Sequence, residues 1–307
     1  MTAQPFALAE SSELAHALVA RVLRDHGIRA LFLKGPVATA QGLLPQRVSS
    51  DVDVLCDPSQ MRQAEGVFDG LGWLRYHGGN SDMVAIGMHA TTFVIPGWPC
   101  TVDIHNHFPG LLAPAAEAFA MLWSRRELVT LAHREVPAPS PADHFAVIAV
   151  HALRNADGAP PLISQPTLRE SWARLEEAHR SQVPHYARSV GALEPLRSVL
   201  IDLGGDPGPV DQRFAAELTD WNAVRERPGD SAVLWASRWR RTAWRDRPEL
   251  VFRAFWDISM DRAQRPEQWA LASRRERVSG RIRRSARGIR QLPRAAWALA
   301  RRARKSE

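Results

Sequence analysis

The sequence predicts an α+β fold, in which a small mixed sheet with flanking helices is followed by a mostly helical C-terminal region. Three short segments, 30–33, 51–56 and 100–108, are apolar or alternate between apolar and polar residues, as strands do. Segment 9–26 instead carries its leucines and valines at helical spacing. From residue 167 onward the chain consists of helical patterns separated by glycine and proline.

The composition is that of a soluble globular protein. Of the 307 residues, 45% are hydrophobic and 24% are charged, which allows two domains of ordinary size. No apolar run approaches the ~20 residues of a membrane-spanning helix, and the N-terminus lacks the pattern of a secretory signal. The two cysteines, Cys56 and Cys100, lie in apolar segments and indicate buried thiols in a reducing compartment. We therefore expect a cytoplasmic protein.

The first predicted element is the amphipathic helix 9–26. Ser11 or Ser12 is suited to cap its N-terminus, because a hydroxyl can accept from a free backbone N–H there. Gly27 is expected to end it.

A strand, a tight turn and a short helix come next. The strand 30–33 leads into a turn at Lys34 and Gly35, and Pro36 suits the first turn of the helix that follows. The later elements are expected in this order: a strand opening at Asp51, a helix from Pro58 to Gly70, a hairpin of strands 83–95 and 100–108, a helix from Pro114 to Arg126, a short strand near 129–136, and helices at 143–154, 167–180, 183–203, 211–226, 230–245 and 247–262.

Three aspartates mark the candidate site. Asp51 and Asp53 share one face of their strand, because side chains alternate along a strand. Asp103 lies on a later strand that we expect beside the first. Neighbouring carboxylates repel each other, and a hard divalent cation such as Mg²⁺ or Mn²⁺ relieves that repulsion. The alternative is that these carboxylates cap a turn or are simply hydrated.

The order of several motifs resembles the nucleotidyltransferase superfamily, whose fold is that of polymerase beta. The motifs are LKG, Arg47 four residues before Asp51, DVDVLC, a helix ending in GLGW, and VDIH. The arrangement is similar to an uncharacterised bacterial group with LKG, Arg, DxD and VDxH motifs. It departs from the superfamily at the phosphate turn, where LKG replaces the usual glycine and serine.

This resemblance implies a metal-dependent transfer of an NMP group from an NTP to an acceptor hydroxyl, which could belong to a small molecule, a protein or RNA. It implies that Asp51, Asp53 and Asp103 hold the metal and are catalytic. The residues expected to contact the nucleotide are Lys34, Gly35, Arg47, His89 and His105. His144 and His151, seven residues apart on one helix face, are interpreted as core or capping residues.

Two other functions fit parts of the pattern. His89, His105 and His107 could bind zinc in a hydrolase, since histidines two apart share a strand face. A degenerate nucleotidyltransferase fold could also serve as an inactive binding or adaptor protein.

The net charge is distributed unevenly along the chain. The net charge is +7, but residues 271–307 hold twelve Arg and one Lys against two Glu, so they carry +11 and the preceding residues carry −4. We expect a nucleotidyltransferase-like core at 1–136, a helical domain at 141–270 and a basic amphipathic tail at 271–307. The part of the tail from 272 to 305 suits a polyanion or an acidic membrane surface, or it is a solvated tail without a partner.

Overall fold

The fold is taken from a computed structural model, which describes residues 7–76, 90–154, 163–226 and isolated residues between 239 and 290. The α+β class is confirmed: the described strands all lie between Ala30 and Ala138, with helices among them, and the described part of the chain after Ala138 is helical. The elements are α1 (Leu8–Asp25), β1 (Ala30–Leu33), α2 (Gly35–Ala40), β2 (Asp51–Cys56), η1 (Pro58–Gln60), α3 (Met61–Gly70), β3 (Leu74–Tyr76), β4 (Ala90–Val94), β5 (Thr101–His105), α5 (Ala115–Ser124), β6 (Glu127–Leu131), β7 (Arg134–Ala138), α6 (Pro141–Ala152), α7 (Gln165–Arg174), α8 (Glu177–Ser189), α9 (Leu193–Asp202), α10 (Ala215–Glu226) and η2 (Trp244–Asp246).

The chain forms two compact units. The first is made of residues 1–76, 89–154 and 160–218, and it contains every strand that the structure describes. The second is made of residues 77–88, 155–159 and 219–307, of which the structure describes part of α10 and the isolated residues. The domain boundaries expected from the sequence stay predictions.

A five-stranded mixed sheet forms the centre of the first unit, in the order β1-β2-β5-β4-β3. β2 and β5 run parallel, and the other neighbours are antiparallel. The predicted hairpin between β4 and β5 is confirmed, and so is the expected pairing of the Asp51 strand with the Asp103 strand. β6 and β7 form a separate two-stranded sheet.

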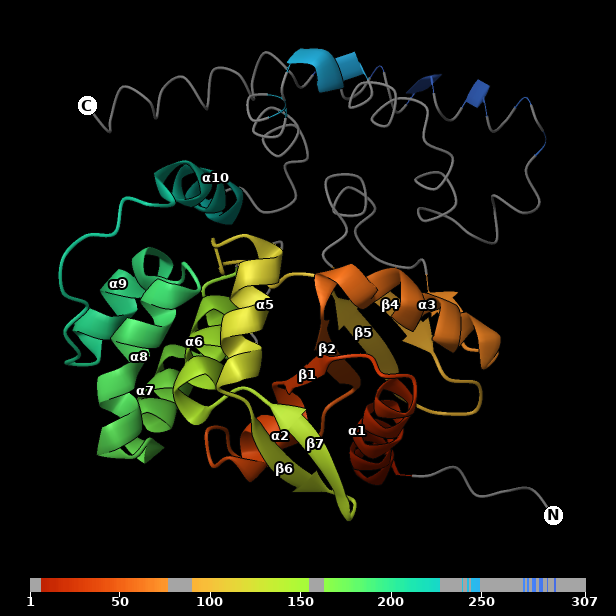
Figure 1. The fold of residues 1–307 in the computed structure, drawn as a ribbon, viewed down its shortest axis with the longest axis horizontal. Helices are drawn as coiled ribbons and strands as arrows, with labels where there is room; N and C mark the ends of the chain where they lie inside the picture. Colours follow the sequence, from red (N-terminus) through yellow and green to blue (C-terminus); the bar gives the residue numbers. More distant parts are fainter. Residues whose placement is uncertain are drawn as a thin grey trace. The chain divides into compact units, whose positions relative to one another are not determined.

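Each face of the five-stranded sheet packs on its own hydrophobic core. Phe32, Val52 and Val102 point to the face that α1 and α3 cover. Leu33 and Leu55 point to the opposite face and share a core with α5 to α9, which lie together beside the sheet in Figure 1. Because alternate residues of β2 share a face, the aspartates lie on the same side as Leu55. The carboxylates therefore lie on the face of the sheet that shares its core with α5 to α9.

Two of the expected local features in the first half of the chain are wrong, and one strand was missed. No serine side chain caps α1, which begins after Ala7, and both Ser11 and Ser12 are buried within the helix. The single strand expected near 129–136 is the hairpin of β6 and β7, because Ala132 and His133 adopt positive φ and reverse the chain. β3 was not expected from the sequence.

The single helix expected over 183–203 is two helices, α8 and α9. The break occurs at Gly191, whose φ of +74° no helix can contain. The loop that precedes α5 packs against this glycine: the N–H of Ala113 donates to the Val190 carbonyl at 3.2 Å, and the N–H of Leu112 donates to the Gly191 carbonyl at 3.4 Å.

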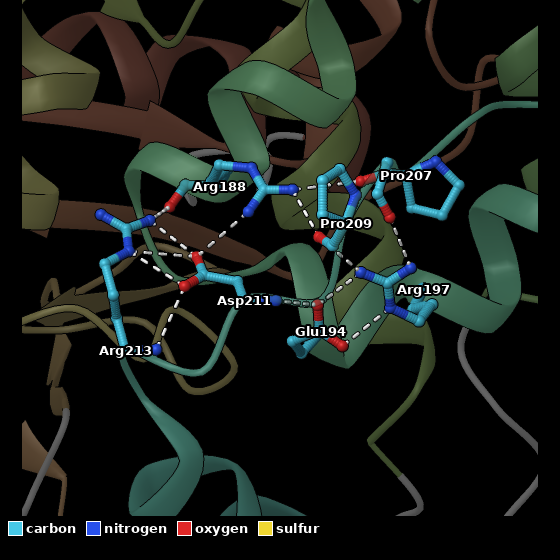
Figure 2. Close-up of polar contacts among 8 residues, drawn as sticks. Arg188, Glu194, Arg197, Pro207, Pro209, Asp211 and Arg213 are labelled. Carbon is cyan, nitrogen blue, oxygen red and sulfur yellow. Dashed lines mark hydrogen bonds and ion pairs between the residues drawn. The ribbon is translucent and has the colours of Figure 1, made fainter.

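A network of charged side chains holds the segment after α9 against α8 and α9 (Figure 2). Arg213 donates to both Asp211 oxygens, at 3.0 and 2.7 Å for the shortest contacts. Arg197 pairs with Glu194 at 2.6 Å, and Glu194 also accepts the backbone N–H of Asp211 at 2.8 Å. Arg188 donates to the carbonyl of Pro209 at 2.7 Å. These bonds replace regular backbone pairing in the loop.

Several expectations concern residues outside the described ranges. They include His89, the helices at 230–245 and 247–262, and most of the tail 271–307. Of the apolar stripe of the tail, Val278 and Ile282 are described and exposed. Polyanion or membrane binding by the tail stays a prediction. Every helix in the described part of the chain is too short or too polar to cross a bilayer.

Replacing Gly191 with alanine should destabilise the first unit strongly. A Cβ atom there would lie 2.5 Å from the Ala113 nitrogen, in addition to the cost of a positive φ. Gly204→Ala is the matched control, since Gly204 has a φ of +77° and a Cβ atom added there would meet no other atom within 4 Å. We expect a loss of about 1 kcal/mol for Gly204→Ala and about 3 kcal/mol for Gly191→Ala, measured by urea unfolding. Equal losses would contradict the close packing at Gly191.

Candidate active site

Three carboxylates converge where β2 and β5 run side by side. The parallel register places Asp53 directly opposite Asp103, and Asp51 lies two residues before Asp53 on the same face. One ligand oxygen from each of the three lies within 4.8 Å of the others. The structure thus brings together the aspartates that the sequence pattern singled out.

Asp53 is the aspartate whose negative charge is balanced by neighbouring side chains. The Lys34 ammonium lies 2.7 Å from Asp53 Oδ2, and His105 Nε2 lies 3.0 Å from Asp53 Oδ1. All three side chains are buried. Burial acts to raise the pKa of Asp53, but Lys34 and His105 outweigh it and hold this pKa well below its usual range.

Asp103 is in the opposite situation. Burial raises its pKa, and the charges of Asp53 and Asp51 raise it further, while the Thr92 hydroxyl lowers it by donating a hydrogen bond. Asp103 Oδ1 is buried without a hydrogen-bond partner among the described residues. The raised pKa therefore reflects first the burial of Asp103 and then the negative charges of Asp53 and Asp51.

These residues fit a divalent metal ion. Three carboxylates in reach of one another are the hard oxygen donors that Mg²⁺ and Mn²⁺ take, and one of their buried oxygens has no partner in the described structure. In the described ranges this is the one group of three or more potential metal ligands. No zinc cluster built on His105 and His107 is found there, and the structure does not describe His89.

The Lys34 turn is built by residues from three parts of the chain. Lys34 has a φ of +57°, and its backbone N–H donates to His144 Nε2 of α6 at 2.7 Å. His144 Nδ1 then donates to Gln41 Oε1, and Gln41 Nε2 donates to the Pro139 carbonyl at 2.8 Å. This chain of bonds fixes both the ring and the turn.

His144 must be neutral to act in this way. Burial, together with the Lys34 charge, lowers the pKa of His144 to about 3. The interpretation of His144 as a core residue is confirmed by its complete burial. Its acceptance of the Lys34 N–H could not be seen from the sequence.

Gly35 allows the turn to approach β2. Its φ is +44°, and a Cβ atom would lie 3.2 Å from Ser49 Oγ. Ser49 in turn donates to Asp51 Oδ1 at 3.0 Å. Gly35 therefore lies close to Ser49, the residue that supports Asp51. Its expected contact with the nucleotide stays a prediction.

Arg47 is exposed in the loop between α2 and β2, and its side chain forms no hydrogen bond or ion pair with any residue the structure describes. Its expected contact with the nucleotide stays a prediction.

Four residues near the site were missed: Ser49, Thr92, Gln41 and His16. His16 of α1 donates from Nδ1 to the Ser12 carbonyl at 2.7 Å, and its Nε2 faces the turn, 3.8 Å from a Cβ atom built on Gly35. Only Ser49 carries a sequence signal, because it lies two residues before the metal-binding pattern. The others are brought to the site by tertiary packing.

Comparison with known proteins gives a family for the chain. No curated protein matches. Among solved structures, the antibiotic-resistance factor ANT(2'')-Ia is 12% identical, with a TM-score of 0.38, over 63% of this chain and 95% of that one. A nucleotidyltransferase-like protein from Paracoccidioides brasiliensis is 11% identical, with a TM-score of 0.38, over 64% and 92%. A tRNA nucleotidyltransferase in complex with a primer tRNA and an ATP analogue is 10% identical, with a TM-score of 0.24, over 94% and 99%.

Because these TM-scores are low, the assignment depends on the match of the sequence to a family model. That match extends over residues 8–200, which include β1, the LKG turn, all three aspartates and α6. The chain belongs to the family described as uncharacterised nucleotidyltransferases.

Proposed function

We propose that the protein transfers an NMP group from an NTP to an acceptor hydroxyl, with a divalent ion held by Asp51, Asp53 and Asp103. The observation that supports this most directly is the convergence of the three carboxylates within 4.8 Å, with Asp103 Oδ1 unpartnered among the described residues. Bound Mg²⁺ or Mn²⁺ would neutralise phosphate charge and lower the pKa of the attacking hydroxyl.

Asp103 is the carboxylate suited to receive a proton. Its pKa is raised by burial and by Asp53 and Asp51, so it is a stronger base than Asp53, whose charge Lys34 and His105 stabilise. A base is most effective when its pKa approaches the working pH. In this proposal Asp103 accepts the proton of the acceptor hydroxyl.

Lys34 has a positioning and an electrostatic role. Its ammonium pairs with Asp53 at 2.7 Å, and the relay through His144 and Gln41 fixes its backbone. An arriving triphosphate would offer Lys34 a second anionic partner. Arg47, exposed nearby in sequence, is the other proposed phosphate contact.

The acceptor can be identified by measuring which molecules become labelled by a labelled NTP. Purified protein is incubated with each labelled NTP, Mg²⁺ and cell extract, and incorporation is measured in small-molecule, protein and RNA fractions. Incorporation in one fraction, absent without Mg²⁺, supports the proposal and names the acceptor class. Metal binding without any incorporation would favour the adaptor alternative.

Two aspartate variants should separate catalysis from stability. Asp103→Asn removes a repelled charge, so we expect the melting temperature to stay or rise while transfer is lost. Asp53→Asn leaves the buried Lys34 ammonium without its counter-charge. We therefore expect this variant to lose transfer and to lose about 3 kcal/mol of its unfolding free energy. Transfer rate and thermal unfolding, each with and without Mn²⁺, test both. Unchanged transfer in Asp103→Asn would refute the mechanism.

His144→Leu should lower both stability and the pH dependence of stability. The variant leaves the Lys34 N–H without its acceptor, a cost of about 1–3 kcal/mol at pH 7. In the wild type the pKa of His144 falls from 6.5 to about 3 on folding, so the unfolded state binds more protons between these values. His144 thus makes stability fall as the pH drops below 6.5, by up to about 1.4 kcal/mol per unit.

The pH effect is measured by urea unfolding at pH 7 and pH 5. His185→Leu, which removes an exposed histidine of α8, is the control and should behave as the wild type. A His144→Leu variant with the full wild-type difference between pH 7 and pH 5 would show that this ring is not buried in its neutral form.

A further inference from the structure

Lys34 and two histidines surround Phe108, which lies just beyond the end of β5. The Lys34 ammonium lies 5.7 Å from the centre of the Phe108 ring. The rings of His105 and His151 lie 5.8 Å and 6.3 Å from it, centre to centre. Phe108 is buried and therefore acts as a fixed spacer between the carboxylate site and the end of α6.

Arg154 extends this group. Its backbone N–H donates to the His151 carbonyl at 3.0 Å, so the helical turn continues past α6 and places Arg154 beside His151 on the same face. Arg154 is half-buried, and its guanidinium forms no hydrogen bond or ion pair with any residue in the described ranges. Burial lowers the pKa of Arg154, while the charge of Asp53 acts on it in the opposite direction. Arg154 therefore lies within electrostatic reach of the carboxylate site.

His151 presents a second unused donor or acceptor. Its Nδ1 is buried without a hydrogen-bond partner among the residues that the structure describes. Because burial lowers the pKa of His151 to about 3, this ring is neutral, and its N–H can donate to an oxygen. An unpaired guanidinium beside an unpaired imidazole is costly to bury unless an anion completes it.

The polarity of the site explains which anion fits. The carboxylate site meets Phe108 through Lys34 and His105, and the end of α6 meets it through His151, next to which Arg154 lies. The C-terminal end of a helix repels an anion weakly, so the guanidinium is needed to attract one. A polyphosphate offers an anionic group to each of them, with one phosphate at the metal-binding carboxylates and further phosphates at Arg154 and His151.

We propose that Arg154 and His151 bind the β- and γ-phosphates of the NTP, and hence the pyrophosphate that leaves; this rests on the proposed function. In the transfer the acceptor oxygen bonds to the α-phosphorus, and the bond from the α-phosphorus to the α–β bridging oxygen breaks. The acceptor proton passes to Asp103. The electron pair of the broken bond leaves with pyrophosphate, and Arg154 meets the charge that develops there.

The test compares affinities for inorganic pyrophosphate, ATP and AMP in the presence of Mg²⁺, by calorimetry on the full-length chain. We expect Arg154→Met to weaken pyrophosphate and ATP binding by about tenfold or more, and to leave AMP within twofold. Arg154→Lys should recover part of the loss, because it keeps the charge without the fork of donors. The control is Arg169→Met, at an exposed position of α7, which should match the wild type.

Other outcomes separate the two proposals. Pyrophosphate affinity unchanged in Arg154→Met overturns the phosphate subsite, and so does an equal loss for AMP with a lowered melting temperature, which would indicate a structural role at the end of α6. If Arg154→Met does not fold, Arg154→Lys and His151→Asn decide by the same ratio of pyrophosphate to AMP affinity. Pyrophosphate binding that depends on Arg154, without label transfer from any NTP, supports the subsite and overturns the proposed function. A wild type that binds neither pyrophosphate nor ATP overturns both.

Discussion

Repulsion among three neighbouring carboxylates, of which Asp53 is buried and Asp51 and Asp103 are partly buried, is the constraint on which the rest of this structure depends. Parallel pairing of β2 with β5 forces Asp53 and Asp103 to face each other. Lys34 compensates Asp53, whereas burial and the charges of Asp53 and Asp51 keep the pKa of Asp103 raised. The fold thus maintains a local excess of negative charge, which a metal-binding site requires and a merely stable core would avoid.

The helices after the sheet stabilise this arrangement. α6 shares a hydrophobic core with Leu33 and Leu55 on the face that carries the aspartates. The same helix supplies His144 to the Lys34 turn and ends at Ala152, with His151 in its last turn and Arg154 just after it. One helix therefore supports the compensating lysine at its first turns and carries the proposed phosphate contacts at its end. Changes in the packing of α6 should therefore affect both the support of Lys34 and the proposed phosphate contacts.

Local patterns predicted the parts of the fold that depend on near neighbours. Alternation along β2 and β5 predicted the shared face of Asp51 and Asp53, and helical spacing predicted α1 closely. The break between α8 and α9 was missed, because Gly191 turns the chain where it meets Leu112 and Ala113, nearly eighty residues earlier. The hairpin of β6 and β7 was missed because non-glycine residues, Ala132 and His133, form its turn.

The sequence by itself determined the α+β class and the shared face of Asp51 and Asp53, because side-chain alternation is a local property, while the order of the motifs along the chain indicated that Asp103 joins them. Only the tertiary structure decided which residues support that site. His144 reaches Lys34 across 110 residues, and Thr92 and Asp103 are paired by the register of β4 and β5. A single histidine or threonine carries no periodic signal. Its role depends on which groups packing removes from water and leaves within hydrogen-bond distance.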